Sequence, residues 1–122
     1  MSKTALIRLS QFLAAETKEH GISVFAIHPG TVRTPMNEYN RTSEIVGRRA
    51  PLLQQFFQKL YAEGIDTPIE QSVALVVLLA SDKADALSGR FINVVEDDVN
   101  ELVRRIDEIQ RADLYTLQLN KL

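Results

Sequence analysis

The sequence contains no cysteine among its 122 residues, and it has only two histidines. Disulfide bonds and thiolate metal sites are therefore excluded, and two histidines alone do not make a metal-ligand set. Chains without cysteine are typical of reducing compartments. We therefore expect a cytoplasmic protein that holds no metal.

Long apolar runs and a basic face are also missing. The longest apolar run extends from Val73 to Ala80, far short of the roughly 18 residues that a membrane span needs. The formal net charge is −2, and the lysines and arginines are scattered along the chain, so no basic stripe is available to offset nucleic-acid phosphates. We therefore expect neither a membrane nor a nucleic acid as partner.

The five glycines do not cluster, so the sequence has no glycine-rich loop that could hold a phosphate at the start of a helix. With 45% hydrophobic and 25% charged residues, the composition is typical of a globular protein. At this length we expect a single domain over residues 1–122.

Hydrophobic spacing predicts a helix over residues 2–20, which Gly21 ends in a left-handed conformation. Two short apolar segments, residues 22–27 and 91–95, are predicted strands. Because residues 22–27 are apolar on nearly every position, this strand is predicted to be buried on both faces, as in a parallel sheet covered by helices.

Between the strands, residues 37–66 are irregular in pattern and are predicted to be a lid-like insertion with one short helix. Thr67-Pro68-Ile69-Glu70 resembles a capping box and predicts a helix to about Ser81, buried nearly all round. Residues 97–112 predict a last helix, with i,i+4 ion pairs Glu101–Arg105 and Asp107–Arg111. Its apolar stripe is interpreted as a docking face for a core or a neighbouring subunit; the stripe comprises Val99, Leu102, Val103, Ile106 and Ile109.

This order of elements favours an α/β fold in which the two strands are joined by a right-handed parallel crossover. Two such strands alone leave two open edges, which invite association with other strands. We therefore expect the sheet either to pair with another molecule or to belong to a larger sheet.

Three motifs in order resemble the short-chain dehydrogenase/reductase family. Ser2-Lys3 opens the first helix, Pro29-Gly30-Thr31-Val32-Arg33-Thr34 follows the first strand, and Ser88-Gly89-Arg90-Phe91-Ile92 opens the last strand. The resemblance covers roughly residues 2–95. It implies an incomplete Rossmann-like, doubly wound parallel sheet, of which the chain is the C-terminal portion, and an NAD- or NADP-dependent hydride transfer on a small alcohol or carbonyl substrate.

The resemblance also implies the roles of individual residues. Lys3 is expected to bind the nicotinamide ribose and to favour the phenolate form of a catalytic tyrosine, since a nearby cation lowers a phenol's pKa. Pro29 and Gly30 form the corner at the carboxyl end of the strand, where ligands bind in open α/β sheets. The backbone at Val32 and the hydroxyl of Thr34 are expected to hold the nicotinamide amide.

The sequence departs from the family pattern at its most reactive positions. The catalytic tyrosine belongs four residues before Lys3, a position that precedes Met1. The family's serine, asparagine and glycine-rich turn are likewise not found here. We therefore expect the C-terminal half of such an enzyme, inactive alone, whose Met1 is either a miscalled start or the start of a true truncation product. The alternative is a non-catalytic interaction protein that keeps the helices of the fold.

Several other residues allow two interpretations. His28 is expected to be packed and hydrogen-bonded rather than a ligand or base, and Arg48-Arg49 to be solvated rather than to bind a substrate acid. Four residues could line an apolar substrate pocket or simply pack the insertion, namely Leu52, Phe56, Phe57 and Leu60. The family resemblance further implies a homo-oligomer for the intact enzyme.

Overall fold

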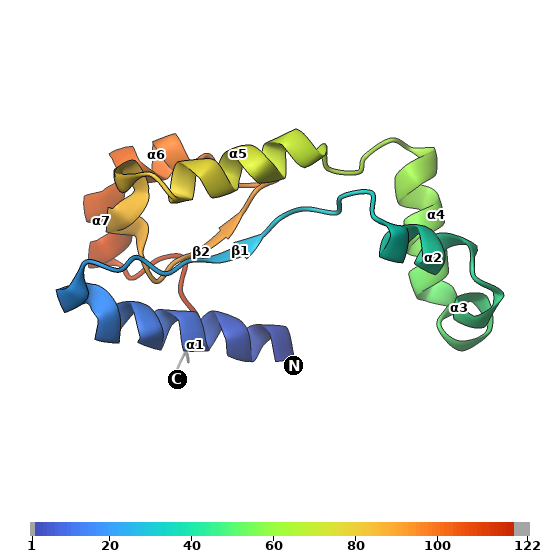
Figure 1. Ribbon diagram of the computed structural model, residues 1–122, viewed down its shortest axis with the longest axis horizontal. Helices are drawn as coiled ribbons and strands as arrows, with labels where there is room; N and C mark the ends of the chain where they lie inside the picture. Colours follow the sequence, from blue (N-terminus) through green and yellow to red (C-terminus); the bar gives the residue numbers. More distant parts are fainter. Residues whose placement is uncertain (1, 119–122) are drawn as a thin grey trace. The chain divides into compact units, whose positions relative to one another are not determined.

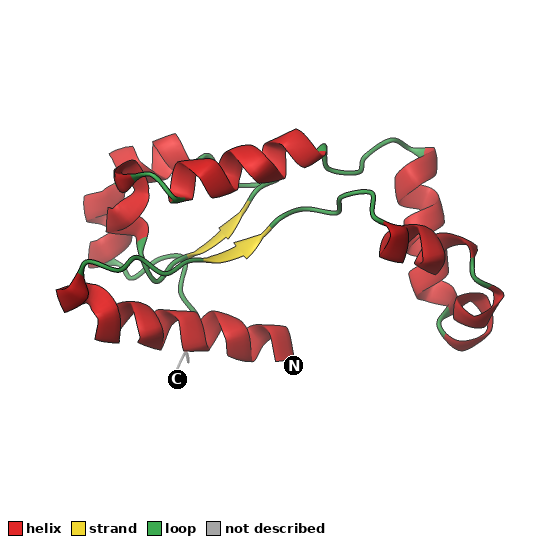
Figure 2. Cartoon of the chain, in the orientation of Figure 1, coloured by secondary structure: helices red, strands yellow, loops and turns green. Residues whose placement is uncertain are grey.

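The computed structural model of the chain describes residues 2–118, which form two compact units. The sheet unit comprises residues 2–29 and 73–118, and the helical unit comprises residues 30–72. Figures 1 and 2 show the helices and strands of each unit.

The sheet unit contains two parallel strands, β1 (Ala26–His28) and β2 (Phe91–Asn93). Ile27 is paired with Ile92 in the middle of the ladder. The chain is therefore α/β with a small parallel sheet, as predicted. Two strands do not display the strand order that defines a doubly wound sheet.

Both strands are shorter than the predicted segments 22–27 and 91–95. Before β1, Val24 bonds to a turn rather than to a strand, because its N–H donates to Ser88 Oγ (3.0 Å) and its carbonyl accepts from Gly89 N (2.7 Å). After β2, the Asn93 N–H donates to Asp97 Oδ2 (2.7 Å) and the Asn93 carbonyl accepts from Asp97 N (2.9 Å). These bonds turn the chain and limit the ladder to three residues on each strand.

Helix α1 (Ser2–Thr17) and the 3₁₀ turn η1 (Lys18–His20) occupy the predicted first helix. Gly21 ends it at φ 66°, and its N–H donates to the Lys18 carbonyl, which confirms the predicted cap. In Figure 1, α1 lies on one side of the two strands and α5 (Ile69–Leu79) on the other. The predicted apolar face of α1 is largely exposed, and Phe12 for example is 56% exposed.

Helix α5 starts two residues after Thr67, close to the predicted position, but it is buried on one face only. Leu75 and Leu79 are buried, whereas Val77 is 64% exposed. The prediction that this helix is buried nearly all round is therefore wrong for the described residues, because a two-stranded sheet offers too little surface to cover it.

The core of the sheet unit joins α5, β2 and the C-terminal helices. It includes the 3₁₀ segment η2 (Asp82–Leu87), whose Leu87 is fully buried, as is Ile92 of β2. The apolar stripe of the last helical region packs here, which confirms its interpretation as a core face. The buried members of the cluster are Leu75, Leu79, Ala84, Leu87, Ile92, Val99, Leu102 and Ile109.

The predicted helix over residues 97–112 is divided into α6 (Val99–Arg104) and α7 (Ile106–Arg111). Arg105, at φ −100° and ψ 22°, breaks the helical geometry between them. The predicted i,i+4 pairs are accordingly replaced by i,i+3 pairs, Arg104 with Glu101 (3.4 Å) and Arg105 with Glu108 (2.7 Å).

The helical unit is more regular than predicted. Its helices are α2 (Pro35–Thr42), α3 (Glu44–Arg49) and α4 (Pro51–Ala62). Pro35 and Pro51 stand at the first positions of α2 and α4, where proline's fixed φ suits a helix and its missing N–H costs no bond. Both prolines are thus helix starts.

Candidate functional site

The predicted corner begins where β1 ends, and Gly30 is its most constrained residue. Gly30 has φ 79°, a left-handed conformation that favours glycine. A Cβ on Gly30 would lie 2.2 Å from Thr67 Oγ1 and 2.6 Å from Thr67 Cβ. The backbone therefore approaches Thr67 more closely than any side chain would allow.

Thr31 and Thr67 join the two ends of the helical unit. The Thr31 N–H donates to Thr67 Oγ1 (3.0 Å), and the Thr67 N–H donates to the Thr31 carbonyl (3.0 Å). Thr67 is only 7% exposed, so these bonds are shielded from water. The sequence suggested Thr67 only as a helix cap, and no local spacing reveals a partner 36 residues away.

Val32 and Thr34 carry the polar groups of the corner that are predicted to contact a ligand. The Val32 carbonyl accepts from Asn37 Nδ2 (2.7 Å), while in residues 2–118 its N–H donates to no acceptor. Thr34 is the N-cap of α2, because its hydroxyl accepts from Asn37 N (3.2 Å). That bond uses a lone pair and leaves the hydroxyl proton available for donation.

Arg33 fastens the corner to the segment that precedes Thr67. Its guanidinium makes a bidentate hydrogen bond to the Asp66 carboxylate: Nε donates to Oδ2 (2.7 Å) and Nη2 donates to Oδ1 (2.9 Å). The guanidinium also lies over the Tyr61 ring, 4.9 Å from its centroid. The hydrogen bond from Arg33, with its positive charge, lowers the pKa of Asp66 below its usual range.

Lys3 lies in the first turn of α1 and is exposed. Helix α1 packs beside β1 and runs in the opposite direction, so its first turn lies at the end of the sheet unit where β1 reaches Pro29 (Figure 1). Lys3 and Pro29 therefore share one end of this unit. Gly30, Val32 and Thr34 belong to the helical unit. The cofactor-binding roles of all five residues stay predictions.

The remaining candidates are distributed differently from the predictions. His28 is exposed rather than packed, because it is the last residue of β1, although its carbonyl accepts from Val94 N (3.0 Å). Arg48 is exposed and bonds to Glu44 (3.0 Å), which suits the solvated interpretation.

The apolar side of α4 divides into buried and exposed residues. Phe57 and Leu60 are buried in the described structure, while Leu52 is 79% and Phe56 52% exposed. The two buried residues pack the insertion, and the two exposed ones remain available to a ligand.

Residues 2–118 contain neither a metal-binding cluster nor a membrane-spanning helix. No group of three or more metal-ligating side chains of the His, Cys, Asp or Glu type comes together there. In the same range, no helix combines the length and the apolar character needed to cross a bilayer.

Comparison with known proteins identifies the class. A sequence model of a protein family, described as Enoyl-(Acyl carrier protein) reductase, matches residues 1–95. The chain therefore belongs to this family, the short-chain dehydrogenases/reductases, and the resemblance inferred from the motifs around Lys3 and Gly30 is confirmed. No solved structure matches the chain significantly.

Three relatives illustrate the similarity. A short chain dehydrogenase of Monascus ruber, pigC, is 38% identical over 112 residues, which are 92% of this chain and 32% of the relative. A short-chain dehydrogenase/reductase of Armillaria gallica is 39% identical over 93 residues, 76% of this chain and 35% of the relative. An NAD-dependent oxidoreductase of Mycobacterium tuberculosis is 40% identical over 94 residues, 76% of this chain and 34% of the relative. The chain thus spans about a third of the length of these curated relatives.

Proposed function

We propose that these residues form the C-terminal part of an NAD- or NADP-dependent oxidoreductase, the part that holds the nicotinamide amide. The observation that carries this proposal is the Val32 N–H, which has no acceptor within residues 2–118, close in sequence to the capping hydroxyl of Thr34. Both donors stand on a corner fixed by Thr67 and Asp66. A carboxamide is the kind of group that two neighbouring donors can orient.

A bound nicotinamide would supply hydride transfer to or from an alcohol or carbonyl substrate. The task of this chain's residues is orientation: the Val32 N–H and the Thr34 hydroxyl would donate to the amide and so fix which face of the ring meets the substrate. Lys3 would bond the ribose hydroxyls and favour the phenolate form of a neighbouring tyrosine through its positive charge.

The finer architecture belongs to the same proposal. In residues 2–118, β1 pairs only with β2, so its second edge is open, and apolar side chains of α1 and α5 are exposed. Further strands on that edge would complete the doubly wound sheet. The turns that follow them would supply the binding site for the cofactor phosphates, which the scattered glycines do not provide. We also propose a cytoplasmic location and a homo-oligomer. The alternative of a non-catalytic interaction protein receives no support from the comparisons.

The test measures cofactor binding by the intrinsic fluorescence of NADH and NADPH. The chain of 13.7 kDa is compared with the protein purified from its native source, whose intact mass is determined in parallel. We expect saturable binding by a native protein of larger mass and weak or no binding by the 122-residue chain. Saturable micromolar binding of NADH or NADPH by the chain alone would contradict the proposal that the phosphate-binding site lies outside these residues. Absence of binding by the native protein would contradict the oxidoreductase assignment.

A further inference from the structure

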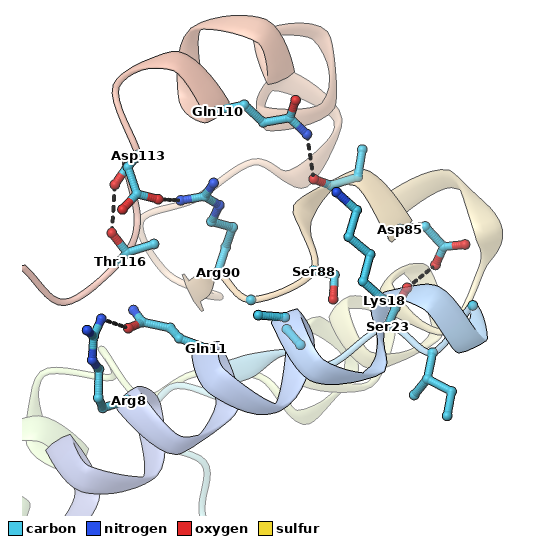
Figure 3. Close-up of a pocket in the computed structure, with 16 residues that line it drawn as sticks. Arg8, Gln11, Lys18, Ser23, Asp85, Ser88, Arg90, Gln110, Asp113 and Thr116 are labelled. Carbon is cyan, nitrogen blue, oxygen red and sulfur yellow. Dashed lines mark hydrogen bonds and ion pairs between the residues drawn. The ribbon is translucent and has the colours of Figure 1, made fainter.

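A cavity in the sheet unit lies at the amino ends of the two strands, the opposite end from the Pro29 end of β1. It has a volume of about 540 Å³ and is lined by residues that precede β1, such as Ser23, and β2, such as Ser88. Helix α1 forms one wall, and the segment after α7 forms another (Figure 3). The proposed cofactor corner follows the carboxyl end of β1, so this cavity is a separate feature of the fold.

Two cations of this cavity, Arg8 and Lys18, have no carboxylate partner within residues 2–118. Arg8 donates from Nη1 to Gln11 Oε1 (2.8 Å) and to the Leu117 carbonyl (3.0 Å), both of which are uncharged. The Lys18 ammonium makes no hydrogen bond or ion pair in residues 2–118. Figure 3 shows Arg8 and Lys18 on opposite sides of the cavity.

The carboxylates of the cavity are already engaged. Asp113 accepts from Arg90 Nη1 (2.5 Å), and Asp85 accepts from the Ser23 hydroxyl (2.8 Å). Three cationic side chains against two carboxylates leave an excess of positive charge among the lining residues, although the whole chain carries −2. An anionic ligand in this cavity would meet the positive charges of Arg8 and Lys18, which form no ion pair with a carboxylate of residues 2–118.

The wall also contains a donor without an acceptor. The side-chain nitrogen of Gln11 is buried and has no hydrogen-bond partner in residues 2–118. Burying such a group is unfavourable unless it finds an acceptor. Its oxygen is held by Arg8, so the amide is oriented by the same cation that faces the cavity.

We propose that this cavity binds a small organic polyanion through carboxylate or phosphate oxygens. Its volume is within the range of small-molecule sites, roughly 300–1,000 Å³. Arg8 and Lys18 supply charge-assisted hydrogen bonds from opposite sides, and the Gln11 amide adds a neutral donor after a small side-chain adjustment. Small residues such as Ala15 and Gly89 leave room for the ligand between these groups.

The test titrates the ¹⁵N-labelled chain with citrate, pyrophosphate and acetate at constant ionic strength, followed by NMR. We expect citrate or pyrophosphate to shift the Gln11 side-chain amide and the backbone amides of Gly21 and Gly89 saturably, with a Kd of about 1 mM or tighter. Acetate, with a single charge, is expected to bind more weakly. Tighter binding of citrate indicates a carboxylate ligand, and tighter binding of pyrophosphate indicates a phosphate ligand.

Three exposed positions provide the variants. Arg8→Gln and Lys18→Gln are each expected to weaken binding by about tenfold, because each removes one charge-assisted bond. Lys83→Gln removes the same charge from the sheet unit outside the cavity, and it is expected to leave the affinity unchanged. Absence of saturable shifts, or equal weakening by Lys83→Gln, would overturn the proposal. Circular dichroism of each variant verifies that the fold is retained.

Discussion

Thr31 and Thr67, which flank the helical insertion, are joined by two hydrogen bonds of 3.0 Å each. In each bond a backbone N–H is the donor. The bonds close the insertion at its base, directly beside the corner that carries Val32 and Thr34. The proposed amide donors therefore owe their position to a residue that a local sequence pattern assigns only to a helix start.

Replacing Thr67 tests this closure. Thr67→Val keeps the side-chain shape but removes the acceptor of the Thr31 N–H, which is then left without its bond. We expect a loss of about 1–3 kcal/mol in the free energy of unfolding, and faster hydrogen exchange at Thr31. Thr67→Ser keeps the hydroxyl and is expected to retain the protection of that amide. Unchanged exchange at Thr31 in Thr67→Val would show that the bond is not formed in solution.

Gly30→Ala tests the close approach of the corner to Thr67. Both the positive φ and the contact with Thr67 oppose a Cβ, so we expect a loss of more than about 2 kcal/mol in urea denaturation. Gly64→Ala is the matched control, because Gly64 has φ 63° but no atom within 4 Å of an added Cβ. That control is expected to show only the conformational cost, about 1 kcal/mol. Equal effects of the two substitutions would rule out the contact.

The ion pair of Asp66 with Arg33 predicts a pH dependence. Because the pKa of Asp66 is lowered in the folded state, the pair stabilises the fold above the unfolded-state pKa of about 4. This contribution is lost as the pH falls from about 4 through the folded-state pKa. Urea denaturation of the wild type and of Asp66→Asn between neutral and acidic pH measures it.

For this ion pair, we expect the wild type to be the more stable protein at neutral pH and the difference to disappear in acid. Arg33 is largely exposed, so added salt is expected to reduce the difference. A difference that stays constant over the whole pH range would contradict a contribution from the Asp66 charge.

Ile92→Ala tests the core of the sheet unit. Ile92 is fully buried between β1 and the helices, so the substitution creates a cavity and is expected to cost about 2–5 kcal/mol of stability. Val95→Ala, two residues beyond β2, removes a side chain that is 64% exposed and is expected to cost less than about 1 kcal/mol. Thermal or urea unfolding of both variants provides the comparison.

Local rules predicted the parts of this fold that depend on near neighbours. Gly21 ends the first helix as expected, since a left-handed residue without Cβ relieves a helix end wherever it occurs. The stripe from Val99 to Ile109 packs into the core as its spacing indicated, although the break at Arg105 was not visible in that spacing. The motifs of Lys3 and of Pro29 to Thr34 were sufficient to identify the family.

The sequence by itself therefore determined the α/β class, the parallel crossover, the family and the position of the corner, because helical periodicity and ordered motifs are properties of short segments. Only the tertiary structure decided where the strands stop, that the insertion is helical, and that Thr67 and Asp66 hold the corner in place. The start of β1 and the closure of the corner depend on contacts between residues more than 30 positions apart, and such contacts leave no periodic trace in the sequence.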